Sequence, residues 1–167
     1  MNRTEFARYA LRVAGVVVVA AVVLFHTGLL PVGGEVAPDR EIRVTDCEGT
    51  EKGHLEVGVA ETFTERYVGL SRTGSLAPDE GLVLAYDEAG SKGIAMRNMN
   101  FALDVVFVSS DGEITKIETL DAPESAISYY LTYDSTSGPG RFVVETNAGW
   151  AEANGVSPGD CVRGLPA

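Results

Sequence analysis

An uncharged stretch of eighteen residues, Val13 to Leu30, constrains this 167-residue chain more than any other part of its sequence. As a helix it would span about 27 Å, which is close to the thickness of a bilayer's hydrocarbon core. Three arginines precede it against a single glutamate, and this positive excess is typical of a cytoplasmic flank. The sequence therefore predicts a cytoplasmic N-terminus at 1–12, a transmembrane anchor at 13–30 and an exported remainder.

A cleaved signal peptide is the alternative for this stretch. The stretch is long for a signal peptide, and residues 26–31 contain no clear small-x-small cleavage site. Under either interpretation, 31–40 is a linker that contains Gly and Pro, and 41–167 is one exported domain. The predicted localisation is the cell membrane, crossed once, with the C-terminal domain outside the cytoplasm.

The exported part is strongly acidic. The formal net charge of the chain is −11. Its first thirty residues hold three Arg and one Glu, a net charge of +2, so the rest of the chain has a net charge of −13. Such a surface repels nucleic acid and anionic lipid headgroups, so neither is expected as a partner. An acidic, lysine-poor surface is also typical of proteins that stay soluble in high salt. Loss of the fold at low salt would support this halophile-like interpretation, and full stability in dilute buffer would contradict it.

Two cysteines, Cys47 and Cys161, lie near the two ends of the exported domain. Their flanking segments have strand character, so a disulfide between the first and last strands is predicted, with two buried free thiols as the alternative. The only histidines are His26 and His54. The chain therefore cannot assemble the three or four clustered ligands of a zinc or copper site from His or Cys, and we expect no metal and no cofactor.

Apolar patterns divide the exported domain into strands. Apolar residues alternate with polar ones in 41–45 and 54–60, and apolar runs at 81–86, 104–109 and 141–146 predict further strands. The dipeptide Asp111-Gly112 between two β-rich runs predicts a hairpin.

Two short helices are expected beside these strands. Thr62 and Glu65 have the spacing of a capping box, which predicts a helix that buries Phe63, Tyr67 and Leu70. A second helix is expected at 148–154, closed by Gly155. The tyrosines of 128–133 are expected along a strand face, with a sugar-stacking aromatic lip as the alternative. The predicted fold class is α+β and β-rich, a curled or barrel-like, mostly antiparallel sheet with one or two short helices, preceded by one transmembrane helix.

Four sequence blocks follow one another in the order and spacing of a known family. They are Glu65-Arg66-x-x-Gly69-Leu70-x-Arg72, Gly81 to Tyr86, Met96-Arg97-Asn98 with Leu103 to Val108 and the Asp111-Gly112 turn, and Phe142 to Trp150 followed by Gly155 to Asp160. On these blocks, 54–163 resembles the uncharacterised family called domain of unknown function 192, or uncharacterised protein family 0127. The middle block departs from the family pattern, because Ala95 and Ala102 stand where an aromatic residue and a proline are common. The resemblance implies a small β-rich domain, often exported or membrane-anchored, without an established activity.

The candidate ligand-binding residues are cations of this acidic domain and their polar or family-matched neighbours. They are Arg66, Arg72, Met96, Arg97, Asn98, Asp104 and Asn147. In a purely structural interpretation, Arg97 pairs with Asp104 and Asn147 caps the helix that begins at Ala148. In a functional interpretation, these residues form a small cationic cleft for a carboxylate or sugar acid, with Asn98 as the orienting donor.

The predicted function is a non-catalytic binding module for a small anionic ligand or an envelope protein. The first alternative is an envelope carbohydrate-active enzyme with Asp104 or Glu145 as acid or base. That mechanism needs two carboxylates that face each other at about 5–10 Å across a cleft. The second alternative is a structural subunit of a membrane complex, contacted through the N-terminal helix.

Overall fold

The computed structural model describes residues 3–26 and 36–167, which fall into two units that are treated separately here. The first unit contains α1 (Arg3–His26), whose span Glu5–Leu24 is long and apolar enough to cross a membrane. A signal sequence passes the same test of length and composition. The end of the predicted anchor and most of the predicted linker, 27–35, lie outside the described residues.

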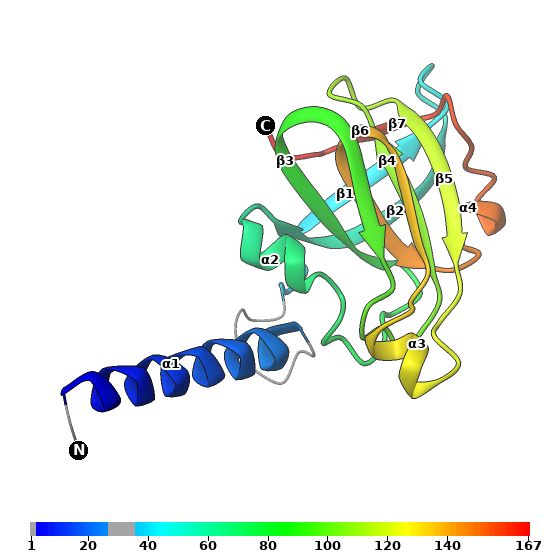
Figure 1. The fold of residues 1–167 in the computed structure, drawn as a ribbon. Coiled ribbons are helices and arrows are strands. Elements are labelled where there is room, and N and C mark those ends of the chain that lie inside the picture. Colours follow the sequence, from blue (N-terminus) through cyan, green and yellow to red (C-terminus); the bar gives the residue numbers. More distant parts are fainter. Residues whose placement is uncertain (1–2, 27–35) are drawn as a thin grey trace. The chain divides into compact units, whose positions relative to one another are not determined.

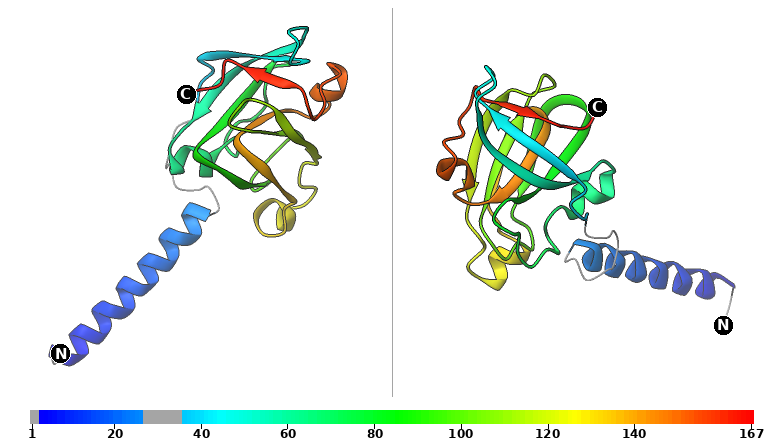
Figure 2. Two further views of the ribbon diagram at one scale, coloured as in Figure 1. Left: turned by 90° about the horizontal axis from the view of Figure 1, so that it is seen from above. Right: turned by 180° about the vertical axis from the view of Figure 1, so that it is seen from behind.

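The described part of the second unit holds a seven-stranded sheet and three short helices (Figure 1). In chain order, the elements are β1 (Arg40–Thr45), β2 (Glu51–Ala60), α2 (Phe63–Val68), β3 (Glu80–Ala95), β4 (Leu103–Val108), β5 (Ile114–Leu120), α3 (Ala126–Tyr130), β6 (Ser135–Asn147), α4 (Trp150–Ala153) and β7 (Cys161–Arg163). The strand order across the sheet is β5-β4-β6-β3-β2-β1-β7. All neighbours are antiparallel except β2 and β3, which are parallel and are connected through α2. Figure 2 shows β1 and β7, the first and last strands, side by side.

The sheet is open, so the predicted curled or barrel-like closure is wrong. The edge strands are β5 and β7, and within 36–167 they approach each other at one isolated bridge, Glu113 to Cys161. A closed barrel needs its two edges to pair along their length. β7 has only three residues, which it uses to pair with β1. The β-rich α+β class and the mostly antiparallel pairing are confirmed.

The central strands bury side chains on both faces of the sheet. In β4, Val106 and Val108 pack into one apolar cluster, whereas Leu103, Val105 and Phe107 pack into another. The first, here called the α4-side cluster, also contains Trp150, Ala151 and Val156, and the second, the α2-side cluster, also contains Leu70, Met96 and Met99. Burial on both faces explains why β4 is a continuous apolar run rather than an alternating one.

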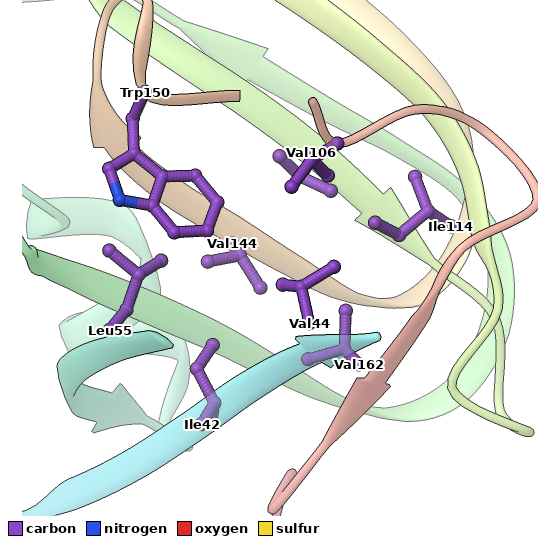
Figure 3. Close-up of a pocket in the computed structure, with 9 residues that line it drawn as sticks. Ile42, Val44, Leu55, Val106, Ile114, Val144, Trp150 and Val162 are labelled. Carbon is purple, nitrogen blue, oxygen red and sulfur yellow. The ribbon is translucent and has the colours of Figure 1, made fainter. Parts of the chain in front are cut away.

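The α4-side cluster encloses a small apolar cavity of about 10 Å³ (Figure 3). It is lined by Ile42, Val44, Leu55, Val106, Ile114, Val144, Trp150, Val156 and Val162. A space of this size holds one water at most, and an apolar lining offers such a water no partners. The cavity is therefore a packing defect of the core, and Trp150 is a core residue.

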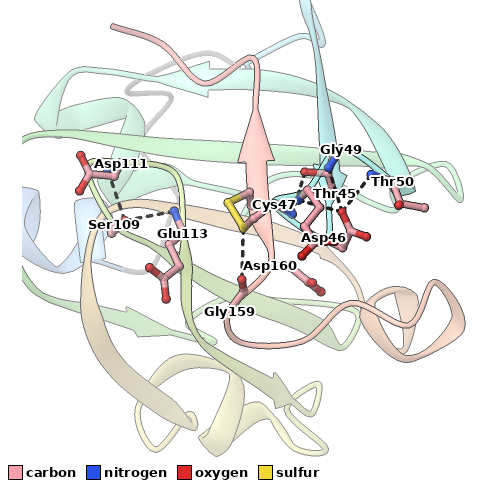
Figure 4. The surroundings of a disulfide bond; sticks show 12 residues. Thr45, Asp46, Cys47, Gly49, Thr50, Ser109, Asp111, Glu113, Gly159 and Asp160 are labelled. Carbon is pink, nitrogen blue, oxygen red and sulfur yellow. Dashed lines mark hydrogen bonds between the residues drawn. A yellow bond between two sulfur atoms is a disulfide. The ribbon is translucent and has the colours of Figure 1, made fainter.

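Cys47 and Cys161 form a disulfide, which confirms the predicted pairing. Cys47 lies in the turn after β1, and Cys161 is the first residue of β7. The carboxylate of Asp46 accepts hydrogen bonds of 2.9–3.0 Å from the backbone N–H groups of 48–50, which closes that turn (Figure 4). Hydrogen bonds from the side chain and backbone of Thr50 lower the pKa of Asp46. The disulfide therefore joins the first and last strands of the sheet.

Gly138 occupies a position in β6 where any side chain would collide with the core. A Cβ atom there would lie 2.6 Å from Cγ of the fully buried Phe107. We expect Gly138→Ala to lower the free energy of unfolding by about 1–3 kcal/mol, because the ring can move only by overpacking its neighbours. Urea unfolding measures this change.

Gly93→Ala is the matched control for this substitution. Gly93 lies in β3, which pairs with β6, and a Cβ atom there meets nothing within 4 Å. We expect its effect to stay within about 0.5 kcal/mol. Equal losses in the two variants would show that strand backbone, and not the contact with Phe107, sets the effect.

Candidate functional site

Helix α2 is fixed at both ends by local interactions. The predicted capping box is confirmed: the Thr62 hydroxyl accepts from the Glu65 backbone at 3.2 Å, and the Glu65 carboxylate accepts from the Thr62 backbone at 2.9 Å. The helix ends at Gly69, whose φ of 49° favours glycine. The predicted buried face is partly wrong, because Phe63 is 73% exposed while Val68 is buried. A helix of six residues buries only its last turn here, and Phe63 lies in its first.

Arg66 holds the helix against β3. Its Nη1 donates to the Ala85 carbonyl at 2.7 Å and also to the Glu61 carbonyl. Its guanidinium lies 4.8 Å from the centre of the Tyr86 ring, and the Lys92 ammonium lies 4.4 Å from the same ring. Burial raises the pKa of Tyr86, and the nearby Glu145 charge adds to this rise, whereas Arg66 opposes it.

Arg97 contacts the same helix from the segment between β3 and β4. Its Nη2 donates to the Tyr67 carbonyl at 2.9 Å, and its guanidinium lies 4.4 Å from the centre of the Tyr67 ring. The residue is only 8% exposed. This buried cation is therefore positioned by the last turn of α2.

Asn98 follows Arg97 and is the most unusual polar residue of the domain. It adopts a left-handed conformation with φ of 57°, and its backbone N–H donates to the Tyr129 carbonyl at 3.0 Å. The residue is 3% exposed, and among the described residues no donor reaches its side-chain oxygen, Oδ1. A buried acceptor without a donor and a non-glycine residue at positive φ are both costly, and such features concentrate at functional sites.

Glu145 brings a buried carboxyl to the same helix from β6. It is 5% exposed, and its Oε2 lies 3.7 Å from the position that a Cβ atom would take at Gly69. Burial raises its pKa from the ordinary 4.5 to about 7. Across 3–26 and 36–167, no hydrogen bond to this carboxyl offsets the effect of burial. Glu145 can therefore change protonation state near neutral pH, which is a property typical of binding and catalytic carboxyls.

The C-terminal end of α2 is thus the common neighbour of two polar groups from distant parts of the chain, Arg97 and Glu145. Arg97 contacts Tyr67, Glu145 lies beneath Gly69, and Asn98 is joined to Arg97 by a peptide bond. We call Arg97, Asn98 and Glu145 the α2-end site. It offers a cation, an acceptor without a donor and a carboxyl that titrates near neutrality.

Comparison with known proteins identifies the family. A family model described as "Uncharacterized ACR, COG1430" and named DUF192 matches residues 44–164. The chain belongs to the DUF192 family. This confirms the resemblance found in the sequence, although the family match says nothing about a membrane anchor.

Two crystal structures resemble this DUF192 protein. One is a candidate transcription regulator from Sinorhizobium meliloti 1021, with 31% identity, a TM-score of 0.66, and coverage of 78% of this chain and 98% of that one. The other is a protein of unknown function from Novosphingobium aromaticivorans DSM 12444, with 28% identity, a TM-score of 0.61, and coverage of 78% and 99%. No curated protein matches the chain.

The remaining candidate residues of this DUF192 protein lie in other surroundings. Met96 is fully buried in the α2-side cluster, and Arg72 is partly buried and has interaction partners. The Asn147 side chain donates to the Ala77 carbonyl at 2.7 Å, and α4 begins after Gly149 without a side-chain cap. The prediction that Asn147 caps this helix is therefore wrong.

Asp104 performs the capping instead, and its predicted pairing with Arg97 is wrong. Its carboxylate accepts from the Thr119 hydroxyl at 2.7 Å and from the backbone N–H of Ala151, in the first turn of α4, at 2.9 Å. Asp104 is 47 residues distant from Ala151 in sequence, so this contact arises from strand packing. The Asp104 side chain therefore lies on the α4 side of the sheet.

Asp104 and Glu145 point to opposite faces of the sheet. Asp104 lies opposite Thr146 and Val105 lies opposite Glu145 in the β4–β6 ladder, so neighbouring side chains alternate between the faces. The two carboxyls therefore do not face each other across a cleft. Among the described residues, no group of three or more His, Cys, Asp or Glu side chains is placed to hold a metal ion.

The tyrosine-rich segment 128–133 is helical in part, so the expected strand face is wrong. A second capping box, Ser125 with Ser128, starts α3, which ends at Tyr130. The tyrosines are frequent in strands, but the serine spacing decides the local structure here. Helix α3 contacts the α2-end site through the Tyr129 carbonyl, which accepts from Asn98.

The sequence did not single out Glu145 as a binding residue. Its only predicted role is that of an acid or base in the enzymatic alternative. The available signal is its place in the apolar run 142–146, where one charged residue interrupts a buried strand. Which face it takes depends on the register with β3 and β4, which the sequence does not reveal.

Proposed function

We propose that the exported domain is a non-catalytic binding module that holds a small anionic ligand at the α2-end site. The observation that carries this proposal is Arg97, a cation that is only 8% exposed in a strongly acidic domain. The adjacent Asn98 has a buried side-chain oxygen that finds no donor among the described residues. A chain that folds for stability alone gains nothing from an unmatched polar atom of this kind, which costs about 1–3 kcal/mol.

The location outside the cytoplasm belongs to the same proposal. An N-terminal helix long enough to span a bilayer and a disulfide in the following domain both support export. The Sinorhizobium meliloti protein is described as a candidate transcription regulator. For this chain, direct binding to DNA is not favoured. The part of the chain after the first thirty residues has a net charge of −13, and this negative charge repels phosphate backbones.

A thermal-shift screen of the full-length protein in detergent and high salt tests the proposal. The compounds are organic acids, sugars, sugar acids and divalent cations. A ligand that binds only the folded state at a hundred times its Kd raises stability by about 2.7 kcal/mol, so a hit needs no assay for a reaction. We expect hits among the anionic compounds.

The variant Arg97→Lys should weaken such a hit at least tenfold in Kd, because a lysine cannot reproduce the planar donor geometry of arginine. Arg163→Ala, which removes an exposed arginine in β7, is the control and should keep it. Unchanged affinity in Arg97→Lys, or the absence of any hit, would move the function to an envelope protein partner or to a structural role in a membrane complex.

A further inference from the structure

Tyr86 is the meeting point of three cations from three parts of the chain. The Arg66 guanidinium of α2 lies 4.8 Å, and the Lys92 ammonium of β3 lies 4.4 Å, from the centre of the Tyr86 ring. Arg141 of β6 donates through Nε to the Tyr86 carbonyl at 3.1 Å. β3 bends between residues 85 and 90, where its pairing with β6 shifts register, and this bend brings Lys92 back to the ring (Figure 1). The fold therefore gathers positive charge at one point of a strongly acidic domain.

No described carboxylate neutralises the two cations on the Tyr86 ring. Among the residues that the structure describes, neither Arg66 nor Lys92 forms a salt bridge. The acidic residues 87–88 that follow the tyrosine are exposed, and Glu145, whose charge acts on Tyr86, is buried. Two like charges that share one ring repel each other, and a bound anion between them removes this repulsion.

Both cations keep hydrogen-bond donors for a ligand. Arg66 uses Nη1 for the carbonyls of Glu61 and Ala85, whereas its Nε and Nη2 donate to none of the described residues. The Lys92 ammonium has three donors, and within 36–167 it lies against the ring without a hydrogen bond. Arg66, Lys92 and Tyr86 are all partly exposed, so a ligand in solution can reach them.

We propose that Arg66 and Lys92 bind a doubly charged oxyanion, such as sulfate, phosphate or the phosphoryl group of a monoester. Two neighbouring cations are matched by two negative charges on one group, which a single carboxylate does not supply. The oxygens of such a group accept from the guanidinium and from the ammonium at the same time. A small dianion meets only this point, whereas a nucleic acid would lie along the acidic surface. The site does not use Arg97, so it is independent of the function proposed above.

Equilibrium dialysis of the full-length protein in detergent, at constant ionic strength, tests the proposal with sulfate against methyl sulfate. Both probes present a tetrahedral oxyanion, but methyl sulfate has a single negative charge. We expect sulfate to bind about tenfold or more tightly than methyl sulfate, because its second charge pairs with the second cation. The same comparison of inorganic phosphate with glucose 6-phosphate distinguishes a free ion from a phosphoryl group as the preferred form of the ligand.

Substitutions of Lys92 assign the second charge to its partner. Lys92→Gln removes one cation and, among the described residues, no hydrogen bond. We expect it to bind sulfate about tenfold or more weakly and to lose the preference over methyl sulfate. Lys92→Arg keeps the charge and should keep the preference. Arg163→Gln, which removes an exposed cation in β7, is the control that should bind like the wild type, and melting without ligand shows whether each variant is folded.

The outcomes separate this inference from the proposed function. Sulfate binding no tighter than that of methyl sulfate, or a preference that survives Lys92→Gln, would overturn the dianion site. Loss of sulfate binding in Arg97→Lys with full binding in Lys92→Gln would also overturn it, and would support the α2-end site instead. No binding of sulfate or phosphate would overturn this inference alone, because the screen of organic acids tests the proposed function separately.

Discussion

Serine substitution of both Cys47 and Cys161 is expected to lower the free energy of unfolding by about 4–5 kcal/mol. The bond closes a loop between residues 114 positions apart, and the unfolded chain gains the corresponding freedom when the bond is absent. This loss is large, because the total free energy of unfolding of a domain is usually only about 5–15 kcal/mol. Urea unfolding of the wild type and the double variant, both under oxidising conditions, measures it.

Reduction of the wild type provides the control. A reducing agent should bring its stability down to that of the double variant, and it should leave the double variant unchanged. Hydrogen exchange should then be fastest in β7, which has three residues and pairs with β1 on one side. If the fully reduced wild type keeps its oxidised stability, the disulfide contributes nothing to the folded state.

Glu145→Gln is expected to change how stability depends on pH. Burial raises the pKa of Glu145 from 4.5 to about 7 in the folded protein. Between these values the unfolded chain releases the proton while the folded chain keeps it, so wild-type stability falls as the pH rises through this window. Below pH 4.5 both states are protonated, and above pH 7 the loss is complete. A pKa difference of this size corresponds to about 3 kcal/mol.

Glutamine stays neutral at every pH, so the variant lacks this loss. The difference in stability between Glu145→Gln and the wild type should therefore shift by about 3 kcal/mol in favour of the variant between pH 4.5 and pH 8. Urea unfolding at both pH values measures the shift, and the exposed Glu124→Gln is the control. Parallel pH curves for Glu145→Gln and the wild type would show that Glu145 titrates alike in both states.

Local sequence signals predicted local structure well. Thr62 and Glu65 start α2, the Asp111-Gly112 dipeptide connects β4 to β5, and the chain after α4 turns at Gly155 with φ of 63°. In each case the deciding hydrogen bonds or backbone angles involve residues a few positions apart. Such interactions are present in the sequence window itself, so pattern and composition suffice to predict them.

Side-chain partners across the sheet were not predictable in the same way. Arg97 was expected to pair with Asp104, but they contact different elements: Arg97 the end of α2, Asp104 the start of α4. The alternation of side chains assigns each strand residue to one face only after the register is known. Register depends on contacts between segments far apart in the chain, such as Leu82 opposite Glu145.

The sequence by itself determined the apolar helix, the acidic character of the domain that follows it, the β-rich class and the family, and it favoured the pairing of the two cysteines. Only the tertiary structure decided that the sheet stays open, that β2 and β3 run parallel, and that Glu145 and Arg97 both lie near the end of α2. The physical reason is the range of the interactions. Composition, capping and turns act within a few residues, whereas the α2-end site is assembled from three segments that only the packed sheet brings together.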